Sequence, residues 1–221
     1  TLTTEGKAVK SENTDDDTLG NIYVAGGTFL IQSTDDGFHT GGSLVIDGGT
    51  FMITSGDDAF HADQDLVVRG GTIEVQSCYE GLEGHRVTIN GGTITIVASD
   101  DAVNAASSAS AKEEDTEIEN QDGNSKKDPR MDMPGMENDS DAYILIAGGE
   151  LHVNARGDGL DSNGNLYMTG GTVYVNGPSD NGNAALDYDG EAMVTGGIII
   201  AVGGSGMAQG WHGGHGGGHS G

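Results

Sequence analysis

The sequence feature that most constrains the fold is a glycine pair that recurs at a nearly fixed spacing. Successive pairs are 22, 22, 21, 57, 22 and 26 residues apart, and the 57-residue step equals one ordinary step plus about 35 inserted residues. A repeat of this length predicts a stacked, solenoid architecture. The pairs begin at Gly26, Gly48, Gly70, Gly91, Gly148, Gly170 and Gly196.

Short segments of alternating apolar residues lie on both sides of each glycine pair. Counting from the first glycine, the third and fifth residues are apolar, as in Phe51 and Ile53, and another apolar pair precedes the glycines. The twelfth residue is also apolar, as in Phe60. Alternation with a period of two indicates β-strands that bury one face. One repeat cannot bury that face alone, so the repeats must stack and share a core.

These spacings predict an all-β fold, a right-handed parallel β-helix (solenoid) with about 22 residues per coil and one long loop insertion. The right-handed sense follows from the general handedness of parallel crossover connections. We expect a single β-helix domain over residues 1–209. Within it, residues 107–141 are an acidic loop insertion without strand alternation, and residues 210–221 form a Gly/His-rich flexible tail.

The composition excludes several classes of partner. The formal net charge is −26, so neither nucleic acid nor an anionic membrane surface is expected to bind. No apolar run is long enough for a membrane span. Cys78 is the only cysteine, which favours a core-filling role over a reactive thiol. The chain shows no signal peptide and begins without Met, which is consistent with the mature form of a secreted protein. We expect a secreted or cell-surface bacterial protein. The sequence leaves the oligomeric state open.

Acidic side chains recur at fixed positions of the repeat, on either side of the apolar twelfth residue. Stacking should align them in columns along one edge of the solenoid. Two like charges about 5 Å apart repel by about 3 kcal/mol at an effective dielectric near 20, which favours cations between the coils. Numerous oxygen ligands suit Ca²⁺. The predicted metal ligands are Asp35, Asp36, Asp57, Asp58, Glu80, Glu83, Asp100, Asp101, Asn104, Asp158 and Asp161.

Alternatives for these polar residues stay open. The acidic columns could form a solvated surface whose charges point apart. His39 and His61 could bind a transition metal as a stacked pair, or only stack and hydrogen bond beside the acidic column. His212, His215 and His219 could bind zinc or nickel weakly, or belong to a tail without a specific metal.

The outward side of the strands that follow the glycine pairs is a second candidate site. Amides and occasional aromatic side chains recur there, and a flat parallel sheet carrying them could lie along an extended sugar chain. An ordinary β-helix exterior fits the same pattern. Two further tyrosines flank the acidic edge. The candidate sugar-binding residues are Tyr79, Tyr174, Tyr188, Gln32, Gln76 and Asn154.

Several unusual runs occur in order within residues 5–209, namely SGDDAFHAD, YEGLEG, ASDDAVNAA, GGTVYVNGPSDNGNAALDYDG and GSGMAQ. Together they resemble the bacterial secreted carbohydrate-binding parallel β-helix family, which is itself similar to polysaccharide (pectate) lyases. The resemblance implies a calcium-binding β-helix that binds cellulose and pectic acid, without established lyase activity. The residues that it implicates in the calcium region are Asp57, Asp58, Glu80, Glu83, Asp100 and Asp101.

Three functions are compatible with these observations. The first is a calcium-dependent polysaccharide-binding protein for plant cell-wall glycans, either cellulose or an acidic pectin such as polygalacturonate. Replacing Asp58 and Asp101 with Ala should then lower stability in calcium but not in chelator. The second is a calcium-dependent lyase, which needs a basic residue; Arg86 and Arg156 are the candidates, with salt bridges to the acidic column as their expected role. The third is a structural or adhesive surface repeat protein. We expect a binding protein and not an enzyme.

Overall fold

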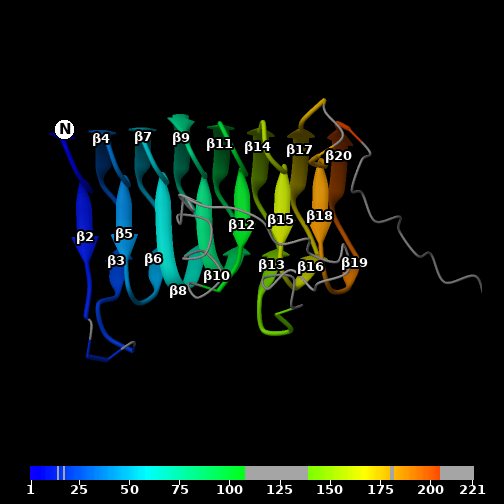
Figure 1. Cartoon of the computed structure of the whole chain (residues 1–221), viewed down its shortest axis with the longest axis horizontal. Coiled ribbons are helices and arrows are strands. Elements are labelled where there is room, and N and C mark those ends of the chain that lie inside the picture. Colours follow the sequence, from blue (N-terminus) through cyan, green and yellow to red (C-terminus); the bar gives the residue numbers. More distant parts are fainter. Residues whose placement is uncertain (14, 17, 108–138, 180–181, 205–221) are drawn as a thin grey trace, which may run out of the picture.

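The chain folds into a parallel β-solenoid. The structure is a computed structural model that describes residues 1–204 except 14, 17, 108–138 and 180–181. In this part the regular elements are all strands, and all strand pairings are parallel. Figure 1 shows the nearer strands running downward and the more distant strands running upward as the chain advances from its N-terminus at the left. This is a right-handed coil, and the predicted fold class is confirmed.

One sheet of eight strands contains the strands that follow the glycine pairs. Apart from a register shift after Val75, equivalent residues of successive coils lie side by side, as Phe29 does with Phe51 and Ile94 with Leu151. The second pairing spans the 57-residue step, so the inserted residues add no coil. In order, the strands are β1 (Leu2–Thr4), β4 (Thr28–Ser33), β7 (Thr50–Thr54), β9 (Thr72–Cys78), β11 (Thr93–Ala98), β14 (Glu150–Asn154), β17 (Thr172–Asn176) and β20 (Ile198–Val202).

A second sheet of twelve strands forms the rest of the wall, and each coil passes through it in two segments. The first segments are β2 (Val9–Ser11), β5 (Phe38–Thr40), β8 (Phe60–Val68), β10 (Leu82–Ile89), β12 (Val103–Ala105), β15 (Leu160–Ser162) and β18 (Leu186–Tyr188). The second segments are β3 (Ile22–Val24), β6 (Leu44–Ile46), the ends of β8 and β10, β13 (Tyr143–Ile146), β16 (Asn165–Met168) and β19 (Ala192–Val194). β8 and β10 run through both parts without a break.

The core is a column of like side chains stacked from coil to coil. The ring of Phe38 stacks on that of Phe60 with centroids 5.1 Å apart, and both residues are fully buried. Such stacks follow directly from apolar residues at the same position of successive repeats. The glycine corner is equally constrained, since Gly71 has a φ of +105° and a Cβ there would lie 2.8 Å from the carbonyl oxygen of Gly49. Only glycine tolerates both conditions.

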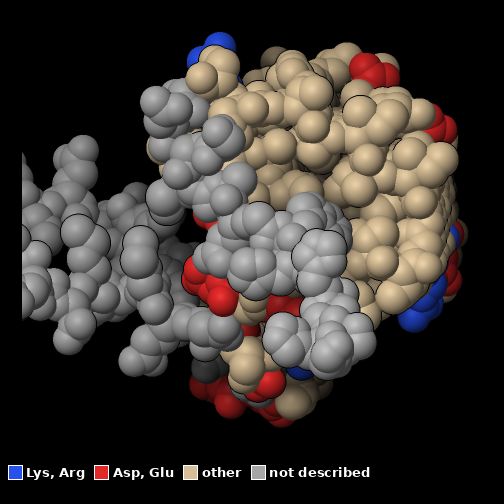
Figure 2. Space-filling view, turned by 90° about the vertical axis from the view of Figure 1, so that its right-hand side faces the viewer, with Lys and Arg blue, Asp and Glu red and all other residues tan. Residues whose placement is uncertain are grey.

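The C-terminal coil leaves apolar side chains at the end of the described structure. Ile198, Ile200 and Val202 on β20 are each more than half exposed. Figure 2 views this end, where most of the described surface is uncharged and acidic atoms lie toward its margins. The described part of the chain contains no helix that could cross a membrane. The predicted loop insertion (apart from residues 107 and 139–141) and the predicted tail lie outside the described residues, so both stay predictions.

Candidate functional site: three clusters along one edge

The acidic residues stack in two columns on the edge where the eight-stranded sheet meets the first segments of the other sheet. The inner column runs through Asp36, Asp58, Glu80, Asp101 and Asp158. Backbone hydrogen bonds between coils align it, such as Gly37 N to Asp58 O at 2.8 Å and Ala102 N to Asp158 O at 3.0 Å. A second column follows it on the strands. It runs through Lys10, His39, His61, Glu83, Asn104, Asp161 and Asp187, one residue per coil.

Carboxylates of the inner column accept hydrogen bonds from the backbone of the next coil. Asp36 Oδ1 accepts from Asp58 N at 3.2 Å, and Asp58 Oδ1 accepts from Glu80 N at 3.2 Å. Asp101 and Asp158 accept in the same way from the next coil. Hydrogen bonds to a carboxylate favour its charged form and offset part of the repulsion. Replacing Asp58 and Asp101 with Ala removes these hydrogen bonds whether or not calcium is present. The double variant should therefore lose stability in chelator too, which differs from the expectation from the sequence.

Three groups of potential metal ligands stand out among the described residues. They are Asp35–Asp36–Asp57, Asp58–His61–Glu83 and Asp101–Asp158–Asp161, here called the first, second and third clusters. Within each cluster one donor atom per residue lies within 4.8 Å of the others. Each cluster combines residues from two adjacent coils, as the sequence predicted, but the three differ in the charge that surrounds them.

The first cluster already contains a cation from the protein. Lys7 Nζ lies 2.8 Å from Asp35 Oδ1 and also contacts Asp36. Burial alone would raise the pKa of Asp36, but its contacts with His39 and Lys7 lower that pKa below the ordinary value. Asp57 is less well compensated, because partial burial and the charge of Asp58 raise its pKa to about 6. The lysine therefore neutralises part of this cluster without a metal.

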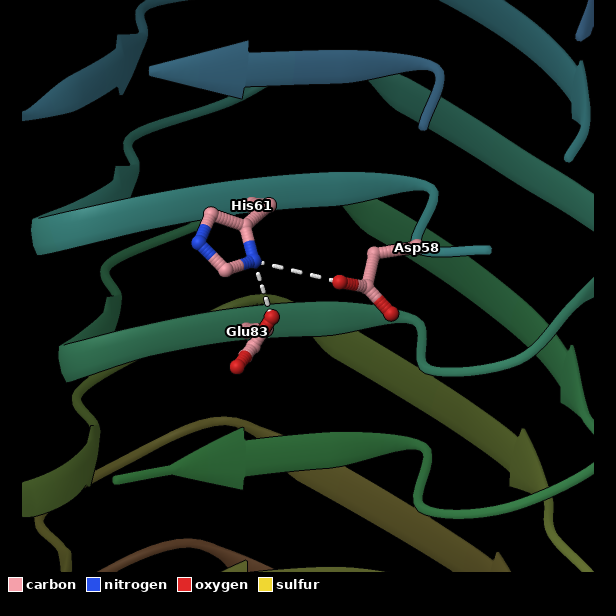
Figure 3. Close-up of side chains that lie close together, drawn as sticks. All are labelled: Asp58, His61 and Glu83. Carbon is pink, nitrogen blue, oxygen red and sulfur yellow. Dashed lines mark hydrogen bonds and ion pairs between the residues drawn. The ribbon is translucent and has the colours of Figure 1, made fainter. Parts of the chain in front are cut away.

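The second cluster surrounds a histidine with carboxylates (Figure 3). His61 Nδ1 lies 3.1 Å from Asp58 Oδ2 and also contacts Glu83, while Nε2 lies 2.9 Å from Asp63 Oδ1. Burial by itself would lower the pKa of His61, but these three contacts outweigh it and raise the pKa to about 12. Burial raises the pKa of Glu83 to about 7, although His61 opposes this shift. Without a metal, the imidazolium is the local counter-ion.

The third cluster consists only of carboxylates. Burial raises the pKa of Asp161 well above its ordinary value, and Asp101, Asp158, Asp187 and Asp189 raise it further. The space for this cluster depends on a glycine. A Cβ at Gly157 would lie 2.3 Å from carboxylate oxygens of both Asp100 and Asp101. Asp100 therefore lies beside the cluster, although it is not one of its three members.

Calcium fits the donor set of the third cluster best. Ca²⁺ takes six to eight oxygen ligands in a flexible arrangement, and this cluster offers carboxylates from two coils. In the first cluster Lys7 competes with an added cation, and the second cluster includes a nitrogen donor. The structure places the remaining predicted ligands elsewhere in the columns: Asn104 Nδ2 donates to both carboxylate oxygens of Glu80 at 3.1 Å. Calcium binding itself stays a prediction.

The candidate sugar-binding residues separate into exposed and buried positions. Tyr174 on β17 stacks on His152 of β14, with ring centroids 4.6 Å apart, and Asn176 donates to Asn154 beside them at 3.0 Å. Tyr79, Gln32 and Gln76 are also exposed. Tyr188 is different, because its side chain is only 7% exposed and packs in the core. Its proposed role in sugar stacking was wrong, since a buried ring offers no face to a ligand.

A hollow of about 650 Å³ opens at the edge of the first three coils. Six of its nine lining residues are Ser or Thr; the lining consists of Thr3, Thr4, Glu5, Gln32, Ser33, Thr34, Thr54, Ser55 and Gly56. It borders the first cluster, because Asp35 and Asp57 directly follow two of these residues. Of the candidate sugar-binding residues, only Gln32 belongs to it.

Sequence reasoning missed two participants of these sites. Lys7 enters the first cluster because the partial first coil stacks on the second, a register that Val9 beside Phe38 already indicated. Asp63 contacts His61 from two residues further along β8. Cys78 is buried, and burial raises its pKa to about 12, which agrees with a core-filling role.

A family model for carbohydrate-binding domain-containing proteins matches residues 1–56 and 37–182. The chain belongs to this family. No curated protein and no solved structure matches the chain. Membership supports polysaccharide binding and suggests a binding role rather than a catalytic one. Arg86, one of the two candidate bases of a lyase, forms a salt bridge in which its Nε lies 2.5 Å from Asp65 Oδ1. Asp65 lies outside the acidic columns, so the partner differs from the one expected.

Proposed function

We propose that the protein binds an acidic polysaccharide through Ca²⁺ held by Asp101, Asp158 and Asp161. The supporting observation is that donor oxygens of these three carboxylates, which come from two adjacent coils, lie within 4.8 Å of one another. Burial and the charges of Asp101 and Asp158 raise the pKa of Asp161. A dication would compensate this charge. Three carboxylates also leave coordination positions on Ca²⁺ for a sugar carboxylate and hydroxyls. This arrangement would join an acidic protein to an acidic polymer such as polygalacturonate.

The neighbouring surface supports this location. Asn154 ends β14 only four residues before Asp158, and the stacked pair of His152 and Tyr174 lies on the same strand and the next one. A polymer bound at the third cluster could therefore continue across exposed amide and aromatic side chains. Aromatic rings present an apolar face with a polar edge, which suits the face of a sugar ring.

The test is affinity electrophoresis in gels containing polygalacturonate, with calcium or with chelator. We expect retardation in calcium that disappears in chelator. Asp161→Asn should weaken the calcium-dependent retardation at least about tenfold, because the ion loses a charged ligand. Glu191→Gln removes one exposed charge from the last coil and is the matched control. Retardation that is unchanged in chelator, or unchanged by Asp161→Asn, would exclude calcium bridging at this cluster.

A second candidate function is binding of a neutral glycan such as cellulose on the eight-stranded sheet. The observation that favours it is the exposed stack of Tyr174 on His152. Tyr174→Ala should then reduce sedimentation with cellulose by several-fold in calcium and in chelator alike. Product absorbance after incubation with polygalacturonate tests the lyase alternative in the same samples, and a binding protein gives no increase.

A further inference from the structure

The second cluster has a different chemistry from the other two, because three donor atoms of two kinds converge on one point. His61 on β8 and Asp58, in the turn before it, come from one coil, and Glu83 on β10 comes from the next. Figure 3 shows both carboxylates pointing at the same ring nitrogen, Nδ1 of His61. A single nitrogen carries at most one proton, so it cannot donate a full hydrogen bond to both carboxylates.

We propose that Asp58, His61 and Glu83 bind a first-row transition-metal dication between these two coils, with Zn²⁺ as the best-fitting ion. A nitrogen donor beside carboxylates suits zinc and similar metals, whereas Ca²⁺ selects oxygen ligands. The site is therefore distinct from the calcium site proposed at the third cluster. It does not depend on polysaccharide binding.

One donor distance is already close to that expected around a tetrahedral ion. Two ligands that are each about 2.1 Å from zinc lie roughly 3.4 Å apart at a tetrahedral angle. The distance from His61 Nδ1 to Asp58 Oδ2 is 3.1 Å, and Glu83 approaches the same nitrogen more closely. A small outward rotation of the Glu83 side chain would bring its oxygen to a similar distance from Nδ1, and the donor oxygens of Asp58 and Glu83 already lie within 4.8 Å of each other. The fourth position would remain for water or another ligand.

The other ring nitrogen of His61 has the partner typical of a metal-binding histidine. Its Nε2 lies 2.9 Å from Asp63 Oδ1. Histidines that bind metals usually donate this second N–H to a carboxylate, which fixes the tautomer and leaves Nδ1 to coordinate. His39 stacks on His61 at 4.7 Å in the adjacent coil, and its Nδ1 contacts the Asp36 carboxylate. Among the described residues, no third metal-binding side chain groups with His39 and Asp36.

The surroundings of the cluster hold further acceptor groups. Asp58, Glu80 and Glu83 are each less than 8% exposed. Asn104 lies beside Glu83 in the strand register, and its Oδ1 is buried without a hydrogen-bond partner among the described residues. Buried carboxyl groups in such number need protons or cations to compensate their charge. Without a metal the imidazolium of His61 supplies one positive charge. A dication bound at Nδ1 would displace that proton, replace the single charge with two and crosslink the coils.

The experiment is a Zn²⁺ titration of the full chain after treatment with chelator. All samples carry Ser in place of His212, His215 and His219, so that these histidines do not contribute. Isothermal titration calorimetry and melting curves measure binding, and Co²⁺ absorption reports nitrogen coordination. We expect one tight Zn²⁺ site that a hundredfold excess of Ca²⁺ does not displace, and a rise in Tm that adds to the rise Ca²⁺ produces at the third cluster.

The variants distinguish a metal site from an ion pair. His61→Asn and Glu83→Gln should each weaken Zn²⁺ binding at least tenfold, and Asp63→Asn about 10- to 100-fold. His39→Asn removes the stacked histidine and should leave the affinity unchanged. Circular dichroism of the metal-free variants confirms that they fold. Equal Zn²⁺ affinity in the parent and His61→Asn, or an equal response to Ca²⁺ at this site, would overturn the proposal.

Discussion

Replacing Asp161 with Asn should stabilise the metal-free protein, although it removes a predicted calcium ligand. Asp161 lies on β15, and its donor oxygen is within 4.8 Å of those of Asp101 and Asp158. The amide has nearly the same shape as the carboxylate and removes one negative charge. Its NH₂ group can also donate a hydrogen bond to either neighbour.

The magnitude follows from the geometry of the cluster. Two charges 4.8 Å apart repel by about 3.5 kcal/mol at an effective dielectric near 20, and Asp161 has two such neighbours. The repulsion cannot destabilise the fold by more than about 5 kcal/mol. That is the cost of protonating a carboxyl with an ordinary pKa of 3.8 at about pH 7.5, and a protonated Asp161 is not repelled. All three side chains are partly exposed, so screening reduces the gain to about 2 kcal/mol.

The assay is thermal unfolding of the parent and the variant, in chelator and in calcium. A gain of about 2 kcal/mol raises Tm by roughly 4–8 °C for a domain of this size. In calcium at a hundred times the Kd, bound ion stabilises the parent by about 2.7 kcal/mol, whereas a hundredfold weaker site leaves the variant only about 0.4 kcal/mol. The advantage of the variant should therefore disappear in calcium.

The pH dependence has a definite sign. The folded-state pKa of Asp161 lies above 3.8, so the folded protein binds the proton more tightly than the unfolded chain does. The parent therefore loses stability as the pH rises from about 4 through that pKa, and the advantage of Asp161→Asn grows over the same range. A variant that is less stable than the parent in chelator, or that gains as much from calcium, would refute this reasoning.

Four further variants test the rest of the structure. Phe38→Ala opens a cavity in the stacked core and should cost about 3–5 kcal/mol in denaturant unfolding, more than the same change at the less buried Phe29. Gly71→Ala should destabilise by at least about 1 kcal/mol because of its positive φ, whereas Gly6→Ala, which has open space, should not. Asp36→Ala should cost about 1–3 kcal/mol at neutral pH with or without calcium, through its lost hydrogen bonds. Gly157→Ala should reduce the calcium-induced rise in Tm, because its methyl group displaces Asp100 and Asp101.

The burial of Tyr188 illustrates where the sequence interpretation failed although the signal was present. From Thr40 onward, the residue that follows each member of the second column is buried, and Ser162 and Tyr188 occupy that position in the last two coils. In the earlier coils small residues occupy this position, so its burial was not evident from the sequence. Tyr188 lies at the acidic edge, as predicted, because it follows Asp187 of the second column. Its side chain points away from that of Asp187, into the core, because side chains alternate along a strand.

The sequence by itself determined the coil, its register and the existence of acidic columns. A repeat of fixed length forces equivalent residues to stack, so one-dimensional spacing becomes three-dimensional proximity. Only the tertiary structure decided what each part of a column does. Lys7, His61 and the carboxylates around Asp161 give three neighbouring clusters three different charges. Those differences depend on side-chain directions across coils, which the spacing of residues along the chain does not encode.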